Sequence, residues 1–542
     1  MNTDTRYTRC IAETIADKSC NGLQRKLDNR QIQLVAVGTS IGTVLFVNIG
    51  HALEKAGPGS LLLAFIIQST MLSTVNNCMA EMATYMPITG GFVRMAGKWV
   101  DDAFGFMAGW NFFFYQSIIV PFEITALSIV LSFWTDKIPP PAVCGVCIAL
   151  YIFLNAMAVG VYGEAEFWLS MGKIILILMM FSFTFITMLG GNPQGDAYGF
   201  RYWVYPGAFA EYITAGTSGK FQGFLAALWA AALACVGPEF ISMIAAEAKH
   251  PRVYLNRAFK TVYWRFCVFY VGSALACGIV VAYNDIELVA SSSGQSSAAS
   301  PYIIAMGNLG IGVLPHFVNA LLITSIFSSG NGCAYYATRC LYGLALEGRA
   351  PQILRKCTKN GVPIYCLAVV MAFPFLSFLQ LSNDSAMVLS WLTSLGTAAI
   401  IINYVVICTT YICFHRACMV QGVDRSKLPY TGWFQPWCAY IGLTWMTTVV
   451  LFYGYTSFEP WNLRSFFLHY TLPILSPILY VVWKLIHKTT FVRPEDVDLN
   501  WDSLQITAYE EALSATESPI NFWREIFQLF SLGECKCNRN RS

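Results

Sequence analysis

The sequence predicts an all-α membrane protein that crosses the lipid bilayer twelve times. Of the 542 residues, 56% are hydrophobic and only 12% are charged, about half the charged share of a soluble domain. The apolar residues gather in long runs, and a helix needs about 20 mostly apolar residues to cross a membrane. We expect spans at 31–51, 59–84, 104–133, 142–161, 166–189, 221–243, 262–283, 313–338, 364–382, 388–414, 437–456 and 467–487.

The distribution of basic residues predicts which side of the membrane holds the two termini. Because the number of spans is even, both termini lie on one side. Of the 34 Lys and Arg residues, 28 fall on that side and five on the other, and loops rich in Lys and Arg stay in the cytoplasm. We therefore expect a cytoplasmic segment at 1–30, a twelve-span domain at 31–487 and a cytoplasmic tail at 488–542.

Composition and spacing argue against several classes of protein. The net charge of +3 gives no reason to expect a nucleic-acid partner. No phosphate-binding loop, catalytic constellation or metal-ligand spacing is present, so an enzyme, a cofactor and a metal site are not expected. Cys144 and Cys147 form a C-x-x-C pair, but it lies inside an apolar run without a matching pair. In the tail, an amphipathic segment at 521–530 precedes Cys535 and Cys537, which are either acylated or unmodified thiols.

Two of the expected spans carry residues that interrupt helices. The first span contains GTSIGT (38–43), and the sixth contains ACVGPEF (234–240). If the first ten spans form two repeats of five, these interruptions occupy matching positions, a pattern that marks binding sites in secondary transporters. Gly38 and Gly42 are also spaced as in a helix-packing motif. Pro238 favours the interpretation as a pair of breaks, since proline lacks the N–H that a helix interior needs.

Three charged residues lie at membrane depth. They are Glu123 on the third span, Lys173 on the fifth and Glu239 on the sixth. Such residues are costly in a membrane and are usually functional, so each is a candidate for carrying a proton. A structural ion pair is the alternative, and Lys173 lies close enough to the end of its span to reach the membrane surface. Glu81, near the end of the second span, is expected at the membrane interface.

Several segments resemble the fungal amino acid permease family, the yeast amino acid transporter group of the amino acid–polyamine–organocation superfamily. The resemblance covers nearly the whole chain, with the motifs in the same order. It includes RQIQLVAVGTSIGTVLFVNIGHALEKAGPGSLL (30–62), AEMATYMPITGGFVRMAGKWVDDAFGFMAGWNFF (80–113), VPFEITA (120–126), GEAEFWLSMGKII (163–175), AAEAKHPRVYLNRAFKTVYWRFCVFYV (245–271) and NALLITSIFSSGNGCAYYATRCLYGLALEGRAP (319–351). Residues 190–212 and 276–289 look most similar to the branch that includes the dicarboxylic amino acid permease.

The resemblance implies a fold and a function. The fold has two inverted five-helix repeats like those of LeuT, at about 31–189 and 221–414, followed by two C-terminal helices. The function is proton-coupled transport of amino acids across the plasma membrane by alternating access, with the proton gradient in place of a cofactor. The implied substrate-binding residues are Ser40, Ile41, Gly42, Thr43, Val44, Cys235, Val236, Gly237 and Glu239. The implied proton-coupling residues are Glu239, Lys173 and Glu123.

The chain departs from the family pattern in both breaks. Val44 stands where the family has a glycine, and a β-branched residue there narrows the pocket. The sixth span reads Val236-Gly237-Pro238-Glu239, where the family often has an aromatic residue before the glycine. These departures keep an alternative open: a transporter of an amino-acid-derived metabolite, such as a small alkaloid. A sensor that binds amino acids without transporting them is a third hypothesis, for which the terminal segments are short. The sequence leaves the oligomeric state open.

Overall fold

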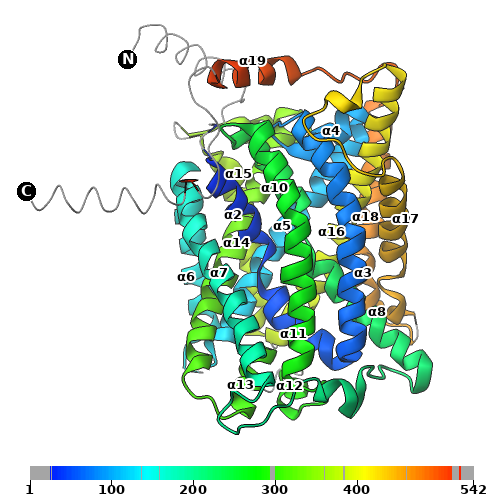
Figure 1. The fold of residues 1–542 in the computed structure, drawn as a ribbon. Helices are drawn as coiled ribbons and strands as arrows, with labels where there is room; N and C mark the ends of the chain where they lie inside the picture. Colours follow the sequence, from blue (N-terminus) through cyan, green and yellow to red (C-terminus); the bar gives the residue numbers. More distant parts are fainter. Residues whose placement is uncertain are drawn as a thin grey trace, which may run out of the picture.

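The computed structural model describes residues 25, 27–135, 137–157, 159–292, 300–358, 361–382, 385–458, 460–514 and 524–525. In these ranges the chain is built almost entirely from helices (Figure 1), and ten of them are long and apolar enough to cross a membrane. The predicted amphipathic segment at 521–530, apart from 524–525, lies outside the described residues, as do Cys535, Cys537 and most of the N-terminal segment.

The helices follow the order of the twelve predicted spans. The first repeat consists of α2 (Asn29–Ser40), which a π-helical turn (Val44–Asn48) joins to α3 (Ile49–Tyr85), then α5 (Asp102–Leu131), α6 (Pro140–Ala156) and α7 (Val159–Met188). The second repeat consists of α8 (Gly216–Ala234) with α9 (Pro238–Met243), α10 (Pro251–Arg265) with a π-helical turn (Phe266–Val271) and α11 (Gly272–Val280), α14 (Leu314–Leu346), α15 (Ile364–Val370) with a 3₁₀ segment (Phe373–Leu381), and α16 (Ser385–Val420). The last two spans are α17 (Trp437–Phe452) and α18 (Leu463–His487).

Shorter helices lie between the spans or, in the case of α19, after the last span. They are α4 (Gly91–Trp99), α12 (Ile286–Ser292), α13 (Pro301–Asn308) and α19 (Ser503–Ser514). The boundary between the first two predicted spans differs from the prediction. No separate loop lies between them, because α3 turns sharply at Gly57 (φ 74°, ψ 165°) and continues. Only glycine adopts such a conformation without strain. The turn is held by a neighbouring loop, since the Gly59 N–H donates to the Ala208 carbonyl at 2.7 Å.

Helix α5 occupies the centre of the bundle. It packs against both α14 and α16, and most of its side chains are buried. Helix α2 packs against α7, and α3 packs against α8. At the periphery, α17 and α18 expose apolar side chains such as Phe452 and Leu485, as expected where helices face lipid. The fold is thus an all-α polytopic membrane bundle.

The two ends of the bundle differ. At one end, which we call the tail side, segment 488–514 with α19 lies across the helices (Figure 1). The Trp99 indole N–H donates to the Asp498 carbonyl at 3.2 Å, and the Arg252 backbone N–H donates to the Glu510 carboxylate at 2.9 Å. The opposite end, which we call the cavity side, carries α12 and α13 (Figure 1). The tail segment therefore covers one end only.

Candidate functional site

The first break begins where α2 ends. Ile41 is extended (φ −112°, ψ 99°), so the carbonyls of the last helical turn lose their usual N–H partners. Side chains replace two of these partners: the Lys173 ammonium donates to the Gly38 carbonyl, and the Ser325 hydroxyl donates to the Ile41 carbonyl at 3.4 Å. The predicted interruption in GTSIGT is therefore a real break in the helix. Because the Lys173 ammonium bonds the Gly38 carbonyl, the alternative in which this side chain extends to the membrane surface does not hold.

A buried carboxylate fills the space beside this break. Glu123 on α5 is 2% exposed, and it accepts hydrogen bonds from the Thr43 hydroxyl and, at 2.8 Å, from the Ser329 hydroxyl. The chain approaches closely here because residue 42 is glycine. A Cβ added to Gly42 would lie 2.5 Å from the Ser329 Oγ and 2.7 Å from the Glu123 Oε1.

A second carboxylate near the first break is not among the residues predicted from the sequence. Glu166 on α7 has a fully buried side chain. It accepts a hydrogen bond from the Ser328 hydroxyl and one at 3.4 Å from the Asn331 amide. Lys173, also on α7, interacts electrostatically with both Glu166 and Glu123. Two acids and one base are therefore buried around one break.

The second break separates α8 from α9. Cys235 has nearly the same extended conformation as Ile41 (φ −81°, ψ 99°), and Gly237 has a positive φ of 150°. Pro238 begins α9, where its missing N–H has no helical acceptor in any case. Two tyrosines satisfy the freed carbonyls, since Tyr270 donates to Val236 at 2.9 Å and Tyr404 donates to Cys235 at 3.3 Å.

Glu239 is the carboxylate of the second break. Its side chain is fully buried in the first turn of α9, where the helix dipole favours a negative charge. It accepts a hydrogen bond from the Gly237 N–H at 3.2 Å. It also shares the one proton of the Tyr404 hydroxyl, at 3.3 Å, with the Cys235 carbonyl. Space remains at this break, because a Cβ added to Gly237 would meet no atom within 4 Å.

The structure brings the two breaks into one region of the bundle. Helix α9 packs on α2, and the π-helical turn after the first break packs on α8. Ile41, Gly42, Thr43, Cys235, Val236, Gly237 and Glu239 are all buried here, and Val44 is partly exposed. The side chain of Ser40 is not among those described.

A cavity of about 910 Å³ leads from the cavity side toward the breaks. Val47, Leu233 and Thr397 line its wall, and the first two stand within a turn of the two breaks. Asn48 at the end of the π-helical turn also lines it, as do His51 and Lys55 on α3. None of the residues predicted to bind substrate is among the lining residues, so the breaks lie behind the wall of the cavity in this conformation.

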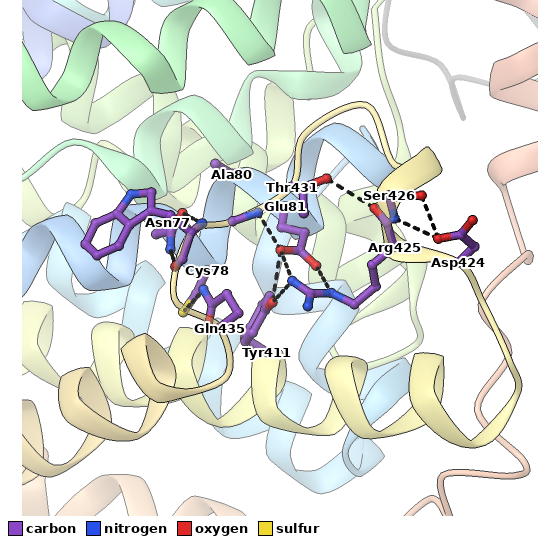
Figure 2. Close-up of polar contacts among 12 residues, drawn as sticks. Asn77, Cys78, Ala80, Glu81, Tyr411, Asp424, Arg425, Ser426, Thr431 and Gln435 are labelled. Atoms are coloured by element: carbon purple, nitrogen blue, oxygen red, sulfur yellow. Dashed lines mark hydrogen bonds and ion pairs between the residues drawn. The ribbon is translucent and has the colours of Figure 1, made fainter.

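Ion pairs close the tail side, and Glu81 is one of their fully buried carboxylates. It accepts two hydrogen bonds from Arg425, each of 2.8 Å, one from Tyr411 at 3.0 Å and one from the Gly432 N–H at 2.8 Å (Figure 2). The bonds to Glu81 raise the pKa of the Arg425 guanidinium above its usual value. The side chain of Glu81, which the sequence predicts at the membrane interface, is fully buried against these partners. Further pairs on this side are Arg94–Glu347, Arg339–Glu247, Arg349–Asp102 and Lys484–Asp101.

Comparison with known proteins places this architecture in a family. The family model described as "Amino acid permease" matches residues 31–494. The chain belongs to the amino acid permease family. This confirms the family identified from the sequence motifs, and the match covers both breaks and all the buried charged residues described above.

The relatives of this permease carry several different names. A general amino acid permease of Saccharomyces cerevisiae, AGP2, is 43% identical over 500 residues, which are 90% of this chain and 84% of that protein. The dicarboxylic amino acid permease of the same yeast is 35% identical over 88% of this chain and 79% of its own length. A proline-specific permease of Emericella nidulans is 35% identical over 88% of both chains. The branch named from the sequence is thus among these relatives.

A solved structure shares the fold. A manganese transporter of Eremococcus coleocola, solved in complex with an aromatic bis-isothiourea compound, aligns with a TM-score of 0.52 and 15% identity. The alignment covers 92% of this permease and 96% of the other chain. At this identity the similarity shows the fold alone.

Sequence reasoning missed the neutral partners of the site as well as Glu166. Tyr270 and Tyr404 bond the carbonyls of the second break, and no Gly-Pro pair marks the spans on which they lie. A tyrosine in an apolar run is usually a packing residue, so no local signal marked them. Glu166 opens the fifth predicted span at residue 166, where a carboxylate is read as part of the preceding loop.

Proposed function

We propose that this permease moves amino acids together with protons across the plasma membrane by alternating access, with the tail side in the cytoplasm. The observation that carries the proposal is the charge content of the first break. Glu123 and Glu166 are both buried there, and one basic residue, Lys173, interacts electrostatically with both carboxylates. An unpaired buried carboxylate is strongly unfavourable, so the charge balance favours a proton bound in this region.

Backbone groups at the two breaks suit the shared part of an amino acid. Helix starts present N–H groups and a positive dipole end, which favour a carboxylate. The Glu239 carboxylate and the second lone pairs of the carbonyls at the breaks favour an ammonium group. Residues Ser40 to Val44, together with Cys235, Val236, Gly237 and Glu239, are the proposed binding residues. Glu123, Lys173 and Glu239 are the proposed proton-coupling residues.

The difference between the two sides supports alternating access. The cavity reaches toward the breaks from one side, while Glu81 and Arg425 close the other. In the proposed cycle, substrate and proton enter from the cavity side, and the ion pairs of the tail side then separate. The orientation follows from the excess of Lys and Arg residues on the tail side. A proton contributes only if it binds one conformation more tightly than the other.

Uptake of labelled amino acids tests the proposal. The permease is expressed in cells that lack their own amino acid permeases, and accumulation is measured with and without an uncoupler. We expect accumulation that the uncoupler abolishes. The same screen includes small alkaloids, since Val44 is partly exposed at the break where family members carry glycine. Accumulation of an alkaloid and of no amino acid would contradict the proposed substrate class.

A further inference from the structure

One face of α7 carries three polar side chains that point toward the first break. Glu166, Ser170 and Lys173 are spaced by four and then three residues, so they share one face of the helix. All three are buried. They converge on Gly38: a Cβ added there would lie 2.5 Å from the Glu166 Oε1 and would also meet the Ser170 hydroxyl, while the Gly38 carbonyl accepts a hydrogen bond from Lys173.

Glu166 is held in place by neutral groups. It accepts hydrogen bonds from the Ser328 hydroxyl and, at 3.4 Å, from the Asn331 amide, both on α14. Asn331 is in turn fixed by α6, because its oxygen accepts a hydrogen bond of 2.8 Å from the Asn155 amide. These bonds orient the carboxylate toward Gly38 but do not neutralise its charge.

Other titratable groups also face this carboxylate. They come from α5, α6, α7 and α14, and on α2 the facing residue is Gly38, which has no side chain. Four groups interact electrostatically with Glu166: Tyr151, Tyr162, Lys173 and Cys333. Glu123 interacts with the same Lys173. Lys173 is the only cation in this set, and its ammonium is bonded to Gly38 rather than to a carboxylate.

We infer that Glu166 is a positioning residue for proton coupling, because it competes with the Gly38 carbonyl for the ammonium of Lys173. When Glu166 is protonated, Lys173 stays on Gly38 and holds α2 against α7. When the Glu166 O–H bond breaks and its proton leaves to water, the carboxylate attracts the ammonium away from Gly38. The end of α2 then loses its contact and is free to move.

This inference rests on the proposed function and assigns a role to a residue outside the proposed binding site. It predicts that proton binding and movement of the first break are linked through α7. The same linkage would make the apparent affinity for substrate depend on pH, since substrate binds beside the break that Lys173 holds.

The test compares Glu166→Gln with Glu164→Gln in purified, reconstituted permease. Glu164 lies on the same helix, its side chain is 37% exposed, and it pairs with Arg30 at 2.9 Å. The probe is a ¹⁴C-labelled mixture of the protein amino acids, and the KM and maximal rate of uptake are measured from pH 5 to pH 8. For one linked proton, KM changes by up to about tenfold per pH unit. We expect Glu166→Gln to lose most of this slope and Glu164→Gln to keep it.

A second variant keeps the test decisive if Glu166→Gln does not fold. Ser328→Ala removes a donor to the ionised carboxylate and should move the midpoint of the pH dependence of KM to higher pH. An unchanged slope in Glu166→Gln, or an unchanged midpoint in a folded Ser328→Ala, would overturn the inference. If the wild-type permease itself shows no uptake driven by a pH gradient, the proposed function fails instead, so the two failures are distinguishable.

Discussion

The two breaks have a similar extended backbone, at Ile41 and at Cys235, but opposite surroundings. The first break is crowded, because Gly42 lies against Ser329 and Glu123, and it is linked to other helices by a carboxylate and an ammonium. The second break has free space at Gly237 and a strained backbone with φ of 150°. Its carboxylate, Glu239, caps its own break through the Gly237 N–H.

This difference suggests a division of roles. A crowded break with charged partners responds to protonation, because its position depends on contacts with α5 and α7. A break that is self-capped and has space around it can accommodate a ligand without moving its neighbours. Glycine is thus required at both sites for different reasons, which are close approach at Gly42 and backbone conformation at Gly237.

The largest expected effect comes from replacing the carboxylate of the second break. Glu239→Gln removes the charge and keeps only one oxygen, so its amide N–H₂ replaces the acceptor of either Gly237 or Tyr404. Hydrogen bonds to charged groups contribute about 1.5–3 kcal/mol each, so uptake should fall by about tenfold or more. Initial rates of uptake, corrected for surface expression, measure this, with the exposed Glu211→Gln as the control. An unchanged rate and pH dependence would remove Glu239 from the mechanism.

Crowding at the first break predicts the next effect. Gly42→Ala should lower stability by about 1–3 kcal/mol, the usual cost of overpacking, and reduce uptake with it. Thermal unfolding of the purified permease measures the loss. Gly145→Ala is the matched control, because a Cβ there meets no atom within 4 Å. If crowding is the cause, adding Ser329→Gly should recover part of the loss, and a purely additive double variant would argue against it.

Backbone strain at the second break predicts a loss of stability similar in size to that at Gly42, but one that no second substitution should reverse. Gly237→Ala forces a residue with a Cβ into a sparsely populated conformation, at a cost of about 1–3 kcal/mol. Because free space surrounds the position, no substitution of a neighbour should restore stability, unlike at Gly42. The same thermal measurement applies. Full stability of Gly237→Ala would mean that the unusual φ is not required.

The smallest effect on stability is expected at Val44, where the result should appear in specificity. Val44 is partly exposed, and glycine there costs about 0.5–1 kcal/mol in helical backbone entropy. Val44→Gly should widen the first break and shift the range of transported substrates toward ordinary amino acids. Competition profiles against the set of protein amino acids measure this shift. Identical profiles would show that Val44 does not shape the pocket.

The sequence was sufficient to predict the spans and the breaks because both depend on local signals. Apolar runs reveal spanning helices, and Gly237-Pro238 cannot continue a regular helix. The surroundings of the breaks depend on packing between distant segments. Glu81 illustrates this point: it looks like an interfacial residue at the end of a span, but Arg425, which lies 344 positions later in the chain, covers it.

Glu166 was missed for a related reason. Near the end of an apolar run, a carboxylate is indistinguishable from one that faces water. Its burial depends on α14, which supplies Ser328 and Asn331. The tail segment was expected as a separate cytoplasmic piece, and its position across the bundle depends on contacts such as that between Glu510 and Arg252.

The sharp turn at Gly57 has a mechanical consequence. Helix α3 runs from the first break to Gly57, reverses there without a loop, and then extends to Glu81 at the opposite end. Gly59 and Ala56 are both hydrogen-bonded to the segment at 208–210. These bonds hold the two parts of α3 at a fixed angle to each other. A tilt of the part beside the first break would therefore move the other part as a rigid lever. The far end of that lever is the ion pair between Glu81 and Arg425, which the movement would strain.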